Sequence, residues 1–132
     1  GAAKANLMPP KLLGITILTS WTQESFANDL MINQSIDQRV KHLAEITSNS
    51  GLGGCVCSPR EVKFLREIYP ESFDLITPGI RSIGSDLNDQ SRVSDASVAL
   101  KMGASKLVIG RAITQSDDPS YMFKRFCDKV IN

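Results

Sequence analysis

A glycine and an arginine follow the last strongly apolar run of the sequence. The run Leu107-Val108-Ile109 leads directly into Gly110 and Arg111. A glycine at this point lets the backbone approach a ligand closely, and the arginine offers a planar fork of N–H donors that suits a phosphate. A turn glycine followed by a solvated arginine explains the pair equally well. The motif alone therefore leaves a phosphate site and an ordinary turn open.

Two other groups of polar residues stand directly after apolar runs. Thr19 and Ser20 place two hydroxyls after the first run, where turn chemistry is the simpler interpretation. The segment Thr77-Pro78-Gly79-Ile80-Arg81 ends the third run and opens a polar stretch that contains Gln90. A loop of residues 78–92 with this composition resembles a lid that closes over a charged ligand, although a solvated surface loop has the same composition.

The residues that most often bind metals do not form a cluster in this sequence. Cys55 and Cys57 lie in an apolar strand pattern, Cys127 lies in a helical one, and His42 is the only histidine. Because no second Cys/His group completes a zinc set, we predict packing thiols and no metal site. His42 falls on the polar side of a predicted helix, so we expect it at the surface.

These residues need strands and helices that place them. Four short apolar runs, near residues 12–18, 53–57, 74–77 and 106–109, are typical of strands buried on both faces of a parallel sheet. Helices are predicted from Ser35, from Ser58-Pro59, from about Ser94 to Met102, and from Asp118-Pro119 onward. Four alternations of strand and helix predict an α/β fold with right-handed crossovers.

Residues 21–34 and 78–92 are longer than the connections need to be, and we interpret both as loops. Each follows the carboxyl end of a predicted strand, where α/β proteins place their sites. Trp21, at the start of the first loop, is expected either under the lid or at a dimer interface. Lys4 and Lys11 precede the first strand and are expected to be solvated.

The composition limits the classes of partner. The 132 residues are 42% hydrophobic and 22% charged, which predicts one globular domain over residues 1–132. Fifteen basic and fourteen acidic residues give a net charge of +1, so there is no large field to attract nucleic acid or an anionic membrane. With no apolar run of ~20 residues and no signal-peptide core, we expect a cytoplasmic protein.

Five segments, taken together, resemble one enzyme family. The segments are Gly14-Ile15-Thr16-Ile17-Leu18-Thr19-Ser20, Gly54-Cys55-Val56-Cys57-Ser58, Thr77-Pro78-Gly79-Ile80-Arg81, Asp89-Gln90-Ser91-Arg92 and Val108-Ile109-Gly110-Arg111. In their order and spacing they are similar to orotidine 5′-monophosphate decarboxylase (OMP decarboxylase). The similarity covers nearly the whole chain. The resemblance implies a homodimeric (β/α)8 TIM barrel that converts OMP to UMP and carbon dioxide without a metal or organic cofactor. A barrel of this kind typically has ~250 residues, so this chain would supply four βα units, the C-terminal half.

The resemblance also implies roles for six residues. Arg111 and the backbone of Gly110 would hold the phosphate, and Arg81 would stand at the root of the lid. Gln90 would reach from the lid to the phosphate and the base. The base end of the nucleotide would meet the hydroxyls of two further residues, Thr19 and Ser20.

Two substitutions and one absence depart from the family pattern. Ser82 and Ala112 stand where the family commonly has proline, and neither change removes a ligand-contacting group. The Asp-x-Lys-x-x-Asp motif that supplies the family's acid–base array does not occur in the sequence. We therefore assign no catalytic residue to this chain, and we expect it to pair with an N-terminal half or with a second copy.

Two alternatives remain open at this stage. A related sugar-phosphate enzyme, such as a 3-keto-gulonate-6-phosphate decarboxylase or a hexulose-phosphate synthase, has the same phosphate-binding site but uses magnesium. Gln90 and the pair Thr19-Ser20 favour the nucleotide enzyme. The absence of the acid–base array instead favours a non-catalytic, phosphate-binding half-barrel as the description of the isolated chain.

Overall fold

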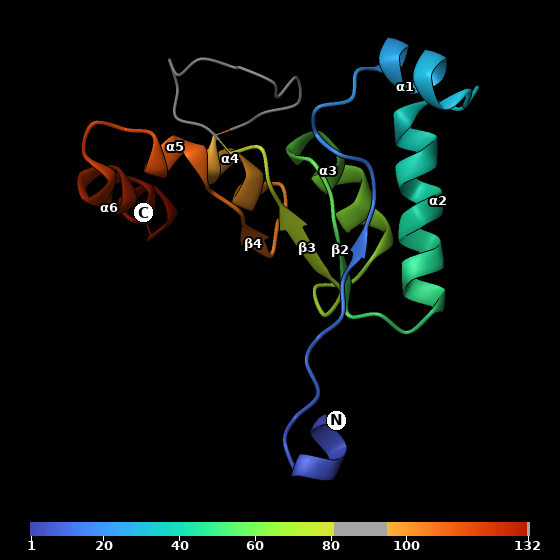
Figure 1. Cartoon of the computed structure of the whole chain (residues 1–132), viewed down its shortest axis with the longest axis horizontal. Helices are drawn as coiled ribbons and strands as arrows, with labels where there is room; N and C mark the ends of the chain where they lie inside the picture. Colours follow the sequence, from blue (N-terminus) through green and yellow to red (C-terminus); the bar gives the residue numbers. More distant parts are fainter. Residues whose placement is uncertain (81–94, 132) are drawn as a thin grey trace.

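Four parallel strands form the sheet at the centre of the computed structural model, which describes residues 1–80 and 95–131 (Figure 1). They are β1 (Gly14–Ile15), β2 (Gly54–Val56), β3 (Asp74–Thr77) and β4 (Lys106–Leu107), and each pairs with the strand before it in the sequence. Each strand lies within one of the four predicted runs. β3 has the predicted length, and the other three are shorter because pairing covers only part of each apolar run.

Helices connect the strands and pack against them. They are the 3₁₀ helix η1 (Ala2–Ala5) and the α-helices α1 (Gln23–Leu30), α2 (Ile36–Asn49), α3 (Pro59–Ile68), α4 (Ala96–Lys101), α5 (Arg111–Thr114) and α6 (Pro119–Ile131). Helices α2, α3 and α4 contact β2, β3 and β4 respectively. The predicted α/β fold with a parallel sheet is confirmed.

Two helices begin at the predicted residues. At the start of α2, Gln38 N–H donates to the Ser35 hydroxyl at 3.2 Å, and Ser35 N–H donates to Gln38 Oε1 at 3.1 Å. At the start of α3, Ser58 N–H donates to the buried Glu61 carboxylate at 2.6 Å, while the Ser58 hydroxyl makes no cap hydrogen bond. The local capping chemistry that is visible in the sequence thus sets both helix starts.

The hydrophobic core lies between the sheet and the helices. Cys55 and Leu75, which are paired in register, are fully buried against Val40 of α2 and against Val62 and Leu65 of α3. The alternate positions of the strands, among them Ile15, Val56 and Ile76, are also in register and occupy the opposite face of the sheet. We call this the inner face, because it is the face that a closed barrel would enclose.

The cysteines are packing residues, as predicted. Cys55 and Cys57 are buried, Cys127 is partly buried, and all three are free thiols. A hydrogen bond with Cys55, together with burial, raises the pKa of Cys57, so its thiol is neutral near pH 7. Across the described residues, no group of three or more Cys, His, Asp or Glu side chains is placed to hold a metal ion.

Two helices were not predicted from the sequence. Residues 21–34, expected to be a loop, include α1, which begins at a capping box between Thr22 and Ser25. Residues 111–114 form the short helix α5 directly after β4. Both helices escaped prediction because their apolar periodicity is weak or too short to register.

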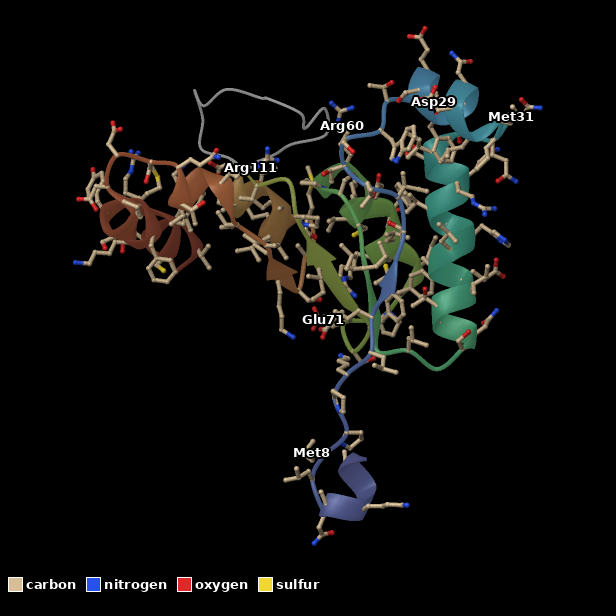
Figure 2. The ribbon with its side chains drawn as sticks, in the orientation of Figure 1. Met8, Asp29, Met31, Arg60, Glu71 and Arg111 are labelled. Atoms are coloured by element: carbon tan, nitrogen blue, oxygen red, sulfur yellow. The ribbon has the colours of Figure 1, made fainter. Side chains whose placement is uncertain are left out.

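The first ten residues stand away from the rest of the molecule. Figure 1 shows η1 at the far end of an extended segment that leads into β1, and Figure 2 places Met8 beside it. Met8 is 92% exposed, and the neighbouring Leu7 is also exposed. No helix in the described part of the chain is both long and apolar enough to span a bilayer.

Candidate functional site

The carboxyl ends of the four strands all lie at one end of the sheet, which we call the mouth. In Figure 2, Arg60 and Arg111 lie at the mouth, and Glu71 lies toward the opposite end of the sheet. Because parallel strands bring their carboxyl ends together, residues that are distant in sequence share this edge. Thr19, Ser20, Gly110 and Arg111 all follow strands at this edge.

Thr19 and Ser20 line a cavity of about 230 Å³ on the β1 side of the mouth. The other lining residues come from the ends of the first three strands and are all uncharged: Ile15, Ile17, Leu18, Val56, Cys57 and Pro78. Apolar walls with two hydroxyls suit a flat, neutral group that makes a few directed hydrogen bonds, such as a nucleobase. The cavity walls contain no charge for a phosphate.

Gly110 and Arg111 lie on the other side of the mouth, after β4. Gly110 is the N-cap of α5, and Arg111 is its first residue, with an exposed side chain. A Cβ added to Gly110 would meet no atom of the described residues within 4 Å. Packing against residues 1–80 and 95–131 therefore does not require a glycine here, whereas a ligand that approaches the backbone closely would require one.

The structure places these two groups apart rather than together. Neither Gly110 nor Arg111 lines the cavity that contains Thr19 and Ser20, and β2 and β3 lie between β1 and β4. An extended ligand with an uncharged end and an anionic end would therefore span the mouth. Arg81 and Gln90, the other two predicted site residues, lie outside the described residues, as do Ser82 and most of the predicted lid loop 78–92.

The end of β3 leads into a buried corner before that loop. Thr77 and Ile80 are almost fully buried, and Gly79 between them has φ = 79°, a conformation that favours glycine. Pro78 in the same corner lines the Thr19-Ser20 cavity. The corner therefore holds one wall of the cavity in a fixed position.

Several residues at the mouth were not predicted as site residues. Cys57 and Pro78 line the cavity, and Ser58 and Thr77 each bury a hydroxyl that has no hydrogen-bond partner among residues 1–80 and 95–131. Thr19 is predicted as a site residue because it is a polar residue at the end of an apolar run. Ser58 and Thr77 also stand at the ends of apolar runs. Ser58 was assigned to helix capping instead, although its backbone N–H, not its hydroxyl, makes the capping contact.

A lysine–aspartate cluster lies at the opposite end of the sheet from the mouth. Lys11 Nζ is 2.9 Å from Asp74 Oδ2, and Lys106 Nζ is 3.2 Å from the same oxygen. Hydrogen bonds from Lys11 and Lys106 lower the pKa of Asp74. Lys11 is exposed, as predicted, and its ion pair joins residues 63 positions apart in the sequence.

Trp21 lies beside α1 at the mouth. Its ring meets Phe26 of α1 edge-on, with centroids 6.4 Å apart and planes at 81°. It also lines a cavity of about 340 Å³ together with Arg60 and Glu61 at the start of α3. Its observed contact is therefore with the unpredicted helix α1.

The parallel sheet, with its strand carboxyl ends at one edge and helices packed against its strands, defines an α/β protein of the barrel class. The chain belongs to the Orotidine 5′-phosphate decarboxylase / HUMPS family, whose model matches residues 1–126. The resemblance inferred from five short segments is thus confirmed at the level of the family.

Curated relatives and solved structures agree with this family. The chain is 83% identical over 130 residues to the orotidine 5′-phosphate decarboxylase of Prochlorococcus marinus strain NATL1A, and 50% identical over 131 residues to that of Parasynechococcus marenigrum. It covers 54% and 53% of those two proteins. The crystal structure of orotidine 5′-phosphate decarboxylase from Lactobacillus acidophilus matches 97% of this chain and 52% of its own length, with a TM-score of 0.79 and 31% identity. The chain therefore spans about half the length of these relatives.

Proposed function

We propose that the chain supplies the phosphate- and base-binding half of an orotidine 5′-monophosphate decarboxylase, which converts OMP to UMP and carbon dioxide. The observation that carries the proposal is the division of the mouth into an uncharged cavity with Thr19 and Ser20 and a cationic end with Gly110 and Arg111. A nucleoside monophosphate has the same division between its base and its phosphate. Arg81 and Gln90 are proposed to complete the phosphate end.

The reaction also needs groups that the described part of this chain does not place at the mouth. Loss of carbon dioxide leaves a carbanion that must be protonated, and a lysine close to an aspartate would meet that need. Lys11, Asp74 and Lys106 have the right residue types but lie at the wrong end of the sheet. We therefore propose that the acid–base array comes from the other half of the enzyme, and that the complete enzyme is a cytoplasmic homodimer.

A fusion enzyme tests this function directly. The part of the Prochlorococcus marinus NATL1A relative that this chain does not cover would be joined to this chain and assayed for UMP formation from OMP. We expect turnover that is lost when the lysine of the Asp-x-Lys-x-x-Asp motif in the added part is replaced by alanine. A folded fusion enzyme that binds UMP but never forms it from OMP would contradict the proposal.

The family description also covers sugar-phosphate enzymes, so the same fusion enzyme should be assayed with 3-keto-gulonate 6-phosphate and magnesium. The uncharged cavity favours the nucleotide, because a magnesium-dependent site needs oxygen ligands beside the substrate. We expect no magnesium-dependent turnover of the sugar phosphate. Turnover of the sugar phosphate alone would assign the chain to the other branch of the family.

A further inference from the structure

The two hydroxyl residues of the uncharged cavity lie in a tight turn after β1. Trp21 N–H donates to Leu18 O at 3.2 Å, and this hydrogen bond closes a turn whose two central residues are Thr19 and Ser20. Thr22 follows directly and is the N-cap of α1. Because the turn runs straight into α1, the position of α1 sets the position of both hydroxyls.

Helix α1 has little packing of its own to fix that position. It has eight residues, all of them described by the structure, and Phe26 is the only one that is buried. At the other end of the helix Leu30 is 44% exposed, and Met31, which follows it, is 90% exposed. Figure 1 shows α1 at the mouth, beside the start of α2. A short helix with one buried side chain gains little from packing, so other contacts must hold it in place.

A cavity of about 340 Å³ separates the start of α1 from the starts of α2 and α3. The described residues that line it are Trp21, Thr22, Gln23, Ile36, Asp37, Arg60 and Glu61. Neighbouring elements of a protein are usually fixed by close packing of their side chains. Because these residues enclose open space, their packing does not fix the turn on this side.

The side chain of Gln23 joins the start of α1 to the start of α2. Its Oε1 accepts a hydrogen bond from Ile36 N–H at 2.8 Å, and its Nε2 donates to Gln34 O at 3.3 Å. Ile36 is the first residue of α2, so its N–H has no acceptor within the helix. Gln23 is exposed, whereas Ile36 is buried. The two hydrogen bonds therefore connect α1 to a fixed part of the fold, 11 and 13 residues further along the chain.

We propose that Gln23 is a positioning residue for the base end of the site. By joining α1 to α2, it holds the turn of Thr19 and Ser20 in the conformation that receives the uncharged end of the nucleotide. Gln23 does not line the Thr19-Ser20 cavity, so it acts through the turn and not by contact with the ligand. Gly110 and Arg111 lie across the mouth after β4, and the phosphate end should therefore be insensitive to Gln23. The inference rests on the proposed function and deepens it.

Gln23→Met in the fusion enzyme tests the role, because methionine has a similar length but makes neither hydrogen bond. The apparent dissociation constant of a ligand rises in inverse proportion to the fraction of molecules whose site is in the binding conformation. Since one hydrogen bond contributes a factor of about two to ten, we expect the dissociation constant of uridine to rise roughly fivefold to tenfold. The dissociation constant of inorganic phosphate should stay within about twofold. NMR titrations of the two ligands would measure both values.

Gln38→Met is the matched control. Gln38 also accepts a backbone hydrogen bond at the start of α2, from Ser35 N–H at 3.1 Å, but that bond lies within the helix cap and does not reach α1. Its uridine dissociation constant should stay within about twofold of the parent value. Hydrogen exchange of residues 18–31 should become faster in Gln23→Met and remain unchanged in Gln38→Met. Equal effects of the two substitutions would overturn the inference.

Gln23→Glu tests which hydrogen bond matters. A carboxylate keeps an acceptor for Ile36 N–H and is favourable at a helix N-terminus, although it cannot donate to Gln34 O. We expect it to recover at least half of the lost uridine affinity on a logarithmic scale. Affinity as low as that of Gln23→Met would overturn the assignment to the bond with Ile36.

The remaining outcomes separate this inference from the proposed function. A parent fusion enzyme that binds uridine but forms no UMP from OMP would contradict the proposed function, and the uridine titrations would still decide the role of Gln23. Unchanged uridine binding by Gln23→Met in an active fusion enzyme would overturn the inference and leave the proposed function intact. Equal losses of affinity for uridine and for phosphate would show general damage and would also overturn it.

Discussion

Arg111 and Gly110 are proposed to contribute to the phosphate site in different ways, Arg111 through its side chain and Gly110 through its backbone. Arg111 starts a short helix at the mouth, whereas a side chain at Gly110 would meet nothing from the described residues. A ligand bound beside Gly110 would give this position a reason to be glycine. Two substitutions at the scale of single residues follow from this difference.

Arg111→Ala in the fusion enzyme should weaken nucleotide binding and slow turnover together. Loss of a charge-assisted contact to phosphate costs about 1.5–3 kcal/mol, which corresponds to roughly a tenfold to a hundredfold change. The effect on kcat/KM for OMP should exceed the effect on the binding of phosphate-free uridine. Unchanged kinetics with OMP would remove Arg111 from the phosphate site.

Gly110→Ala should weaken the binding of UMP while leaving the stability of the fold nearly unchanged. The added Cβ meets nothing among the described residues, so the free energy of unfolding should change by no more than about 1 kcal/mol. Close approach of a phosphate to the backbone would be blocked, and the dissociation constant of UMP should rise by about tenfold or more. Calorimetry would measure the binding of UMP, and urea unfolding of the same preparation would measure stability. A loss of stability as large as the loss of binding would contradict the assignment of Gly110 to the phosphate site.

At the scale of elements, Arg66 of α3 connects three parts of the fold. Its guanidinium donates to the carbonyl oxygens of Tyr69, Pro70 and Phe73 at 3.3, 2.6 and 3.1 Å, and to Gly103 O at 3.0 Å. It also donates to the hydroxyl of Ser105 at 3.0 Å, and that hydroxyl accepts from Leu75 N–H. One side chain thus joins the end of α3, the entry into β3 and the turn between α4 and β4.

Arg66→Ala should destabilise the fusion enzyme by about 2–4 kcal/mol, because several partly buried carbonyl groups lose their donor. Arg66→Lys keeps the charge but not the planar fork, so it should recover less than half of that loss. Urea unfolding followed by circular dichroism would measure both variants. Full recovery by lysine would show that charge alone, and not the geometry of the donors, matters at this position.

Acid should weaken the contact between α4 and α6. Asp95 Oδ2 is 2.8 Å from Lys129 Nζ of α6, and Asp95 also accepts from Ser97 at the start of α4. The hydrogen bond from Lys129 lowers the pKa of Asp95. A lowered folded-state pKa stabilises the fold fully above the unfolded value of about 3.9, and this contribution is lost as the pH falls through the folded value.

The pH dependence of unfolding would measure this contribution. Between pH 7 and pH 3, the urea midpoint of Asp95→Asn should fall less than that of the parent, because the variant has no carboxylate to protonate there. Asp29→Asn, at an exposed position of α1, provides the control and should behave as the parent does. Identical pH profiles for Asp95→Asn and the parent would exclude a role for the Asp95–Lys129 pair.

The sequence predicted the elements that carry local signals. Ser35 and Ser58-Pro59 are capping residues, and helices begin there; the four apolar runs contain the four strands. Helix α1 was missed because its capping partner is Ser25 rather than Glu or Gln, and α5 because four residues carry no periodicity. The ion pair of the exposed Lys11 with Asp74 was missed for a different reason: no local pattern reports a contact between residues 63 positions apart. At the site, Thr19, Ser20, Gly110 and Arg111 could be found from strand ends, but their separation across the mouth needed the strand order.

At the scale of the whole molecule, the exposed inner face and the two open edges predict the behaviour of the isolated chain. The 132-residue chain alone should show no decarboxylase activity, because it contains no Asp-x-Lys-x-x-Asp motif. It should also not be a stable monomer, since Ile15 and Val108 leave apolar surface beside unpaired strands. Sedimentation and an activity assay on chain of verified mass would check both points, and a compact, active monomer would contradict them.

The strand order has a consequence for how the chain folds. Each strand after β1 pairs with the strand made just before it, so each βα unit can add to the sheet as it leaves the ribosome. The bridge from Lys11 to Asp74 is an exception, since it spans 63 residues and passes over β2. It can close only after β3 has arrived, and Lys106 can join it only after β4. The two ion pairs of Asp74 therefore form late in folding. Substitutions of Asp74 should speed unfolding more than they slow folding.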